Sequence, residues 1–165
     1  MKAGGIFGDH EIDPSNYEPV EDCQHGPMSC LAAAVSMAMQ WTATDFDAWT
    51  PPIQERIRAI FRPEERDGIT PAELVLFLRG QTWPLAFKFG LRRCKLPLSL
   101  LRPPKGMAFV PLLAGDPIGH AVVVVSRRPG ELFDPGPGQG RAPTADDEAR
   151  WNKGGRVALV VAYTP

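Results

Sequence analysis

The fold is decided by the stretch Asp22-Cys23-Gln24-His25-Gly26-Pro27-Met28-Ser29-Cys30, which runs directly into Leu31-Ala32-Ala33-Ala34-Val35-Ser36-Met37-Ala38-Met39-Gln40. A polar segment broken by Gly26-Pro27 ends at Cys30, and the alanine-rich run predicts a helix from about residue 29 to 41. The first turn of a helix has unpaired backbone N–H groups and a positive partial charge. A cysteine there gains thiolate character, and the thiolate is the form that attacks carbonyl carbons. Cys30 is therefore a candidate nucleophile.

Other interpretations of the cysteines stay open. Free cysteine is often buried and inert, so Cys30 could simply belong to the core. Cys23, His25 and Cys30, with the distant Cys94, could be zinc ligands, although Cys-x-His-x4-Cys is not a common structural zinc pattern. Cys23 could be the nucleophile instead, but no helix begins directly behind it. Cys94 lies among basic residues without a partner motif and is expected to be inert.

Composition and charge limit the classes of function. The 165 residues fit one domain, and 44% of them are hydrophobic, which provides material for a core. A net charge of −1, from 18 basic and 19 acidic residues, gives no electrostatic case for nucleic acid or an anionic membrane surface. Three cysteines argue against a disulfide framework and fit a reducing compartment.

Targeting signals are not recognisable in the sequence. The N-terminal residues contain no apolar run long enough for a signal peptide, and no stretch approaches the length of a membrane span. We therefore expect a soluble protein that is cytoplasmic as synthesised. Export as an effector, by a route that needs no N-terminal signal peptide, is the alternative.

Helical patterns come first in the chain and strand patterns later, which predicts an α+β fold. We expect a single domain over 1–165, with an N-terminal arm (1–22), a helical part (23–80) and a sheet part (81–165). Thr70, Pro71 and Glu73 form a capping box that begins the clearest helix, and Gly80 ends it. The other predicted elements are helices at 53–61 and 146–153, short helical turns at 45–49 and 96–101, and strands at 85–89, 107–113, 120–126, 131–134 and 156–163.

Two later residues could complete a catalytic site with Cys30. A thiolate needs a base, and His120 opens a valine-rich strand, where a rigid scaffold would present an imidazole. Asp134 stands fourteen residues later, at the end of the next strand, and a hairpin would bring it to the ring of His120. The competing interpretations are a hydrogen-bonded histidine at a strand edge and an Asp-Pro turn.

Gln24, six residues before Cys30, could donate a hydrogen bond to the oxyanion that forms when a carbonyl is attacked. Such an oxyanion needs preorganised donors. The backbone N–H of Cys30 at the helix start is one, and a glutamine amide from the preceding loop is a suitable second.

These motifs occur in one order: Gln24-x5-Cys30 before a hydrophobic helix, then Gly119-His120-Ala121-Val122-Val123-Val124-Val125, then Leu132-Phe133-Asp134-Pro135. The pattern resembles the papain-like cysteine peptidases, and is most similar to the branch that includes the bacteriocin leader-processing peptidase domains. The resemblance covers roughly residues 22–140. It departs from that branch at Leu31, where the leader-processing domains usually have glycine, and over 42–106, which match no motif.

The resemblance implies a papain-like fold, in which a central helix carrying the nucleophile belongs to an N-terminal helical part packed on a C-terminal antiparallel sheet. It implies Cys30 as nucleophile, His120 as general base, Asp134 as the residue that orients the ring, and Gln24 as oxyanion donor. It also implies a thiol protease-like hydrolase with this catalytic triad, which needs no metal or organic cofactor and cleaves a peptide or isopeptide bond in a peptide or protein substrate through a thioester.

Two alternatives to this hydrolase stay open. The papain-like fold also hosts glutamine deamidases and transglutaminases, including effector toxins, because the same triad performs acyl transfer to different acceptors. The second alternative is a catalytically inactive papain-like module used for binding.

Overall fold

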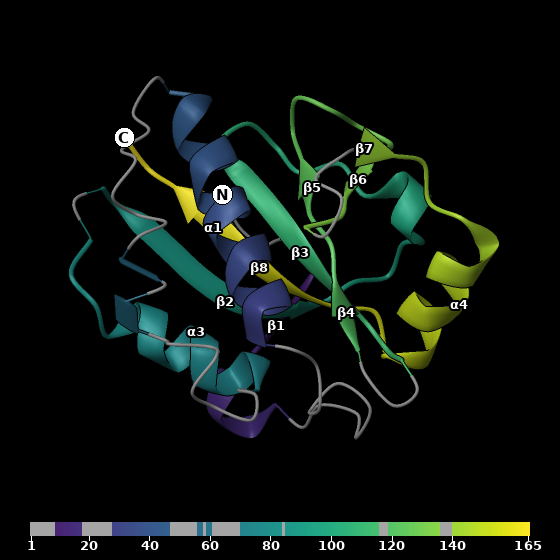
Figure 1. The fold of residues 1–165 in the computed structure, drawn as a ribbon, viewed down its shortest axis with the longest axis horizontal. Coiled ribbons are helices and arrows are strands. Elements are labelled where there is room, and N and C mark those ends of the chain that lie inside the picture. The colour runs from purple at the N-terminus through teal and green to yellow at the C-terminus, as the bar shows by residue number, and fades with distance from the viewer. Residues whose placement is uncertain are drawn as a thin grey trace.

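The computed structural model describes residues 9–17, 28–46, 56–57, 59–60, 70–83, 85–115, 119–135 and 140–165. They combine helices with a main antiparallel sheet (Figure 1), which confirms the predicted α+β class. The helices are α1 (Met28–Thr44), α3 (Pro71–Arg79) and α4 (Ala145–Lys153), with 3-10 turns at Pro14–Asn16 and Leu98–Leu100. Among the described helices, none has the length and apolar character needed to cross a bilayer.

The main sheet has the strand order β1-β2-β8-β3-β4, and β5 also pairs with β3. All of these neighbours are antiparallel. A separate two-stranded sheet pairs β6 with β7. The strands are β1 (His10–Ile12), β2 (Phe87–Arg93), β3 (Met107–Leu113), β4 (His120–Ala121), β5 (Val124–Val125), β6 (Leu132–Phe133), β7 (Gly140–Arg141) and β8 (Val157–Tyr163).

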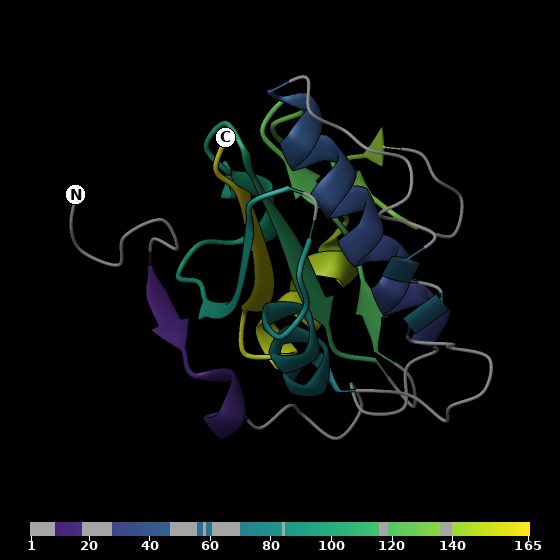
Figure 2. The same ribbon diagram turned by 90° about the vertical axis from the view of Figure 1, so that its left-hand side faces the viewer.

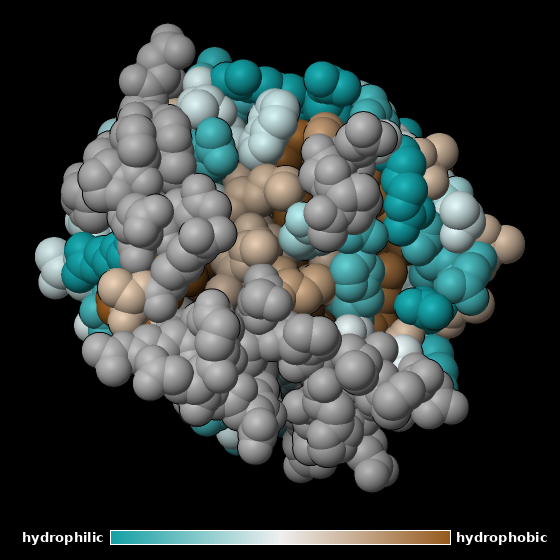
Figure 3. Space-filling view, in the orientation of Figure 1, coloured by the Kyte–Doolittle hydropathy of each residue, from teal (hydrophilic) through white to brown (hydrophobic). Residues whose placement is uncertain are grey.

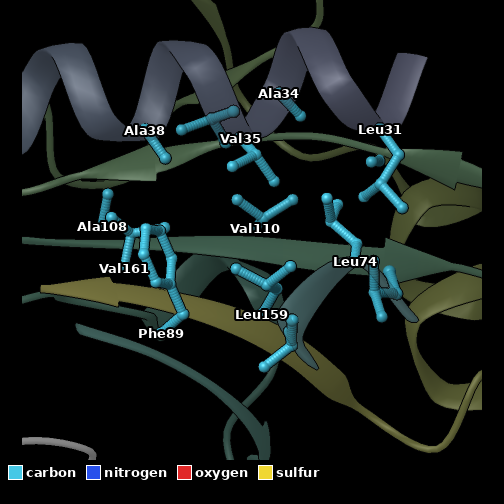
Figure 4. Close-up of a cluster of buried hydrophobic side chains, with 14 of the residues drawn as sticks. Leu31, Ala34, Val35, Ala38, Leu74, Phe89, Ala108, Val110, Leu159 and Val161 are labelled. Atoms are coloured by element: carbon cyan, nitrogen blue, oxygen red, sulfur yellow. The ribbon is translucent and has the colours of Figure 1, made fainter. Parts of the chain in front are cut away.

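Helix α1 covers one face of the main sheet, as the view in Figure 2 shows. Its small and branched apolar side chains point at the side chains of β3 and β8, and α3 adds Leu74 to the same core (Figure 4). Alanines on α1 bring its backbone close to the sheet, because they occupy little space between the two layers. The buried contact consists of Leu31, Ala34, Val35 and Ala38 from α1 against Ala108, Val110, Leu159 and Val161 from the sheet.

The C-terminal end of α1 is tied to the sheet through Asp45. Its carboxylate accepts hydrogen bonds from the Gly106 N–H (3.0 Å), the Ser126 hydroxyl (2.7 Å) and the Arg127 guanidinium (2.6 Å). Burial opposes the charged form, but these donors outweigh it and hold the pKa of Asp45 below its ordinary value. The ties fix α1, and with it Cys30, relative to the strands.

The other face of the sheet has its own core around α4. Trp151 is fully buried there, and its indole N–H donates to the Leu96 carbonyl at 3.0 Å. Side chains alternate between the two faces along a strand, so Ala158 belongs to this second core while Leu159 belongs to the first. Cys94 lies in the second core.

The helix predicted at 70–80 is confirmed in detail. The Glu73 N–H donates to the Thr70 hydroxyl oxygen at 3.1 Å, and the Glu73 carboxylate accepts from the Thr70 N–H at 2.9 Å. The helix at 146–153 and the strands at 107–113 and 156–163 are also confirmed, within one residue at each end. Of the helix predicted at 53–61, the described residues 56–57 and 59–60 are helical.

The strand predicted over 120–126 is divided into β4 and β5. Both parts keep one register with β3, since Ala121 faces Leu112 and Val124 faces Phe109. Val122, between them, faces Pro111 and donates to its carbonyl at 3.3 Å. Proline has no N–H to return the second bond of that pair, so the ladder breaks at this point.

The N-terminal arm predicted over 1–22 contributes a strand where it is described. Residues His10–Ile12 form β1, which pairs with β2 at the edge of the main sheet. Three residues with largely exposed side chains give too little periodicity to predict a strand from sequence.

Candidate active site

Cys30 is the third residue of α1 and is partly buried. Its Sγ lies 3.2 Å from Nδ1 of His120 and 3.7 Å from the carbonyl oxygen of Ala121. The two residues are ninety positions apart in the chain. They meet because α1 packs across the strands, with its first turn beside β4.

His120 is held at both ring nitrogens. Nδ1 faces the sulfur, and Nε2 lies 2.9 Å from Oδ2 of Asp134. A carboxylate accepts only, so Nε2 carries a proton and donates it to Asp134. This bond orients the ring so that Nδ1 points at Cys30.

A short strand contact brings Asp134 to this position. Val123 and Phe133 form a two-way bridge, with backbone hydrogen bonds of 2.9 and 2.8 Å, and Asp134 is the next residue. The sequence predicted a hairpin between 120–126 and 131–134. The described pairing of these two segments is this single bridge, and it is enough to place the carboxylate beside His120.

The surroundings of His120 favour its protonated form. The contact with Cys30 Sγ is the largest influence, burial opposes it, and the carboxylate of Asp134 adds to it, so that the pKa of His120 rises from 6.5 to about 9. At neutral pH the ring is an imidazolium between a sulfur and a carboxylate. That arrangement combines a nucleophile with a proton donor for a leaving group.

The first turn of α1 supplies a further donor. Because the helix begins at Met28, the Cys30 N–H has no carbonyl four residues earlier within the helix. Gln24, the other predicted oxyanion donor, lies outside the described residues, as do Cys23 and His25 of the zinc alternative. Within the described ranges, groups of three or more His, Cys, Asp or Glu side chains that could hold a metal ion are absent.

Cys94 differs sharply from Cys30. It is 5% exposed, and burial raises the pKa of its thiol to about 12, with the negative charge of Asp9 adding to the shift and Arg92 opposing it. A pKa this high keeps the sulfur protonated at neutral pH. The prediction that Cys94 is inert agrees with this environment.

Arg141 and Asp147 belong to the surroundings of the site, and neither residue was predicted from the sequence. A guanidinium nitrogen of Arg141 lies 3.9 Å from Oδ2 of Asp134. The same guanidinium binds both carboxylate oxygens of Asp147. A signal for Asp147 was readable, since Thr144 and Asp147 have the spacing of a capping box. The link to Asp134 depends on the pairing of β6 with β7, which the sequence did not reveal.

Apolar surface lies over α1 on the face of the molecule that Figure 3 shows. Met37 and Trp41 are partly buried on this helix, and the Trp41 ring packs on Phe133 with centroids 5.5 Å apart. A pocket of about 580 Å³ lies on the opposite face of the sheet, where Met107 and Phe109 line it. None of Cys30, His120 and Asp134 lines that pocket.

Comparisons with protein-family models, with curated proteins and with solved structures found no match. Function is therefore inferred from the chemistry of the site. The features that support the inference are the two contacts of His120 and the position of Cys30 in the first turn of α1.

Proposed function

We propose that this chain is a papain-like cysteine hydrolase that cleaves a peptide or isopeptide bond in a peptide or protein substrate. The observation that carries the proposal is the pair of contacts at His120, with Cys30 Sγ at 3.2 Å and Asp134 Oδ2 at 2.9 Å. Both lie within the reach that proton transfer and ring orientation need. The order of the three residues along the chain also supports the resemblance to papain-like enzymes.

In the first half of the reaction the thiolate of Cys30 attacks the carbonyl carbon, and a C–S bond forms while the carbonyl electrons move onto oxygen. The backbone N–H of Cys30 in the first turn of α1 donates to that oxyanion, and we propose Gln24 as its second donor. The C–N bond then breaks. The departing nitrogen takes the proton from Nδ1 of His120, which leaves a thioester and a neutral ring.

In the second half, water attacks the thioester carbon. Neutral His120 accepts a proton from the water as the new C–O bond forms. The C–S bond breaks, the carboxylic acid leaves, and the thiolate–imidazolium pair returns. Throughout both halves, Asp134 keeps Nε2 engaged and so holds Nδ1 toward the sulfur and the substrate.

The proposal is tested with p-nitrophenyl acetate, a small activated ester that reports acyl transfer without a known substrate. We expect a burst of nitrophenol and an acetyl group on Cys30, located by peptide mass spectrometry. Cys30→Ala should abolish the burst, and Cys94→Ala should retain it as the matched control. Acetylation confined to lysines, or an undiminished burst in Cys30→Ala, would overturn the proposal.

A second assay distinguishes peptide-bond cleavage from glutamine deamidation. Peptides that contain glutamine are incubated with the enzyme, and both ammonia release and chain cleavage are followed. Cleavage without ammonia is the result expected of a hydrolase acting on peptide bonds. Ammonia release without chain cleavage would show that the enzyme deamidates glutamine and does not cleave peptide bonds. Cys30 would be the nucleophile in either reaction.

A further inference from the structure

A line of charged side chains continues from the candidate triad toward α4. Asp134 Oδ2 lies 2.9 Å from His120 Nε2 on one side and 3.9 Å from an Arg141 guanidinium nitrogen on the other. Arg141 in turn contacts Asp147 through two nitrogens, and one of these bonds is 3.1 Å long. The line therefore runs from the sulfur of Cys30 through alternating basic and acidic groups to the start of a helix.

We propose that Arg141 is a positioning residue, anchored by Asp147, that holds the Asp134 carboxylate aimed at the ring of His120. This inference rests on the proposed function, because it assigns Arg141 a role in maintaining that site.

The anchor of Arg141 is rigid. Asp147 caps α4, since one of its carboxylate oxygens accepts from the Thr144 N–H at 2.8 Å while its own N–H donates to the Thr144 hydroxyl at 3.1 Å. Its side chain is 9% exposed. A guanidinium bound through two nitrogens to a fixed carboxylate has little freedom to turn, because the planar fork matches the two oxygens.

Asp134 has a position that benefits from such a neighbour. It follows β6 directly, and β6 is a two-residue strand whose Leu132 pairs with Arg141 of β7. The pairing of β6 with β7 therefore brings the backbone of Arg141 close to Asp134. The carboxylate of Asp134 is 16% exposed, so its interaction with a cation is less screened by water and salt than a surface pair.

The electrostatic consequence has a definite sign. A positive charge beside a carboxylate favours its ionised form, and only the ionised form accepts the Nε2–H bond strongly. The same neighbours raise the pKa of Arg141 above its ordinary value. The hydrogen bond to Asp147 is the largest cause, burial opposes it, and the charge of Asp134 adds to it. Removing the cation should therefore weaken the hydrogen bond that His120 Nε2–H donates to Asp134, and should make the reactivity of Cys30 more sensitive to acid.

The test compares Arg141→Gln with the unchanged chain by following the rate of Cys30 alkylation by iodoacetamide as the solution is acidified. We expect the acidic fall in the rate to begin about half to one pH unit higher in Arg141→Gln. Arg141→Lys keeps a charge without the fork and should restore part of the shift. A rate profile that is unchanged, or lowered equally at every pH, would overturn the positioning role.

The matched control is Arg150→Gln on α4, the helix that also carries Asp147. Arg150 pairs with Asp146 at 3.1 Å, and both side chains are exposed, so the substitution removes one charge near α4 without touching the line to His120. The acidic fall should begin at the same pH as in the unchanged chain. A shift equal to that of Arg141→Gln would mean that general charge, and not the contact with Asp134, sets the profile.

A second readout separates this inference from the proposed function. The low-field NMR signal of the His120 Nε2 proton reports the bond to Asp134 and requires no catalysis. In Arg141→Gln this signal should disappear at a higher pH on acidification. If p-nitrophenyl acetate fails to acylate Cys30 while the signal responds, the hydrolase proposal fails and the positioning role stands. If Cys30 is acylated and neither the signal nor the alkylation profile responds, the positioning role fails alone.

Discussion

Cys30 and Cys94 are both free thiols, yet they lie in opposite environments on the two faces of one sheet. Cys30 is partly buried in the first turn of a helix, with an imidazole at 3.2 Å. Cys94 is 5% exposed among apolar side chains, and burial raises its pKa to about 12. The same functional group therefore lies beside an imidazole on one face, and is buried and protonated on the other.

Position in the fold therefore determines the environment of each cysteine more than the local sequence does. Cys94 follows Arg92 and Arg93, and cations beside a thiol ordinarily favour its thiolate. Burial outweighs that effect at Cys94, although the charge of Arg92 does act in the expected direction. Helix α1 contains no basic residue, and the basic group beside Cys30 is His120, on a strand ninety residues away.

The largest effect is expected from Cys30→Ala. Loss of the nucleophile should reduce the acylation rate by about 10⁴-fold or more, because the remaining groups have no atom that can form the thioester. Stopped-flow release of nitrophenol from p-nitrophenyl acetate measures this rate. Retention of more than a small fraction of it would show that another side chain performs the reaction.

The next effect is expected from His120→Ala, which removes the base and leaves the sulfur in place. Alkylation of Cys30 by iodoacetamide near neutral pH should slow by about 10²-fold, in the range that general base assistance contributes. His10→Ala is the matched control, because His10 is an exposed histidine on β1. Equal alkylation rates in His120→Ala and His10→Ala would show that the reactivity of Cys30 does not depend on His120.

A smaller effect concerns the titration of His120. An NMR pH titration should place its midpoint near the pKa of about 9, and Cys30→Ala should move that midpoint back toward 6.5, since the contact with the sulfur is the largest cause of the shift. Cys94→Ala should leave it in place. A midpoint near 6.5 in the unchanged chain would contradict the proposed ion pair.

The same titration has a consequence for stability. The folded state binds the His120 proton more tightly than the unfolded state, because the pKa rises from 6.5 to about 9 on folding. This contribution to the free energy of unfolding is fully present below about pH 6.5 and is lost as the pH rises through about 9. Denaturant unfolding of the unchanged chain should therefore show a decline over this window that His120→Ala lacks.

The smallest effect on the site is expected from Cys94→Ala. Removing one buried sulfur should lower the free energy of unfolding by about 1–2 kcal/mol through lost packing. The alkylation rate of Cys30 should not change, because Cys94 lies in the other core. A slower Cys30 in a fully folded Cys94→Ala variant would mean that the two faces are coupled.

The sequence predicted the parts of this arrangement that depend on local chemistry. The capping box at Thr70 and Glu73, and the helix that carries Cys30 in its first turn, follow from residue types within one or two turns. His120 at the start of a valine-rich strand and Asp134 at the end of the next were selected by motif order, and the structure brings His120 to Cys30 and Asp134 to His120.

Features that depend on long-range pairing were not predicted. The break between β4 and β5 could be predicted only with the knowledge that Pro111 faces Val122. Proline interrupts the hydrogen bonds of the strand that pairs with its own, and the sequence does not show which strand that is. The role of Arg141 requires the pairing of β7 with β6. Strand β1 is stabilised by its pairing with β2, and its three residues carry little signal of their own.

The most direct test of the central claim is the relative alkylation rate of Cys30 and Cys94 in the native chain at neutral pH, measured by iodoacetamide labelling and peptide mass spectrometry. The imidazole beside Cys30 and the burial of Cys94 predict that Cys30 reacts at least about 100-fold faster, and that the contrast disappears when the chain is unfolded in denaturant. Equal rates in the folded chain, or faster labelling of Cys94, would contradict the account.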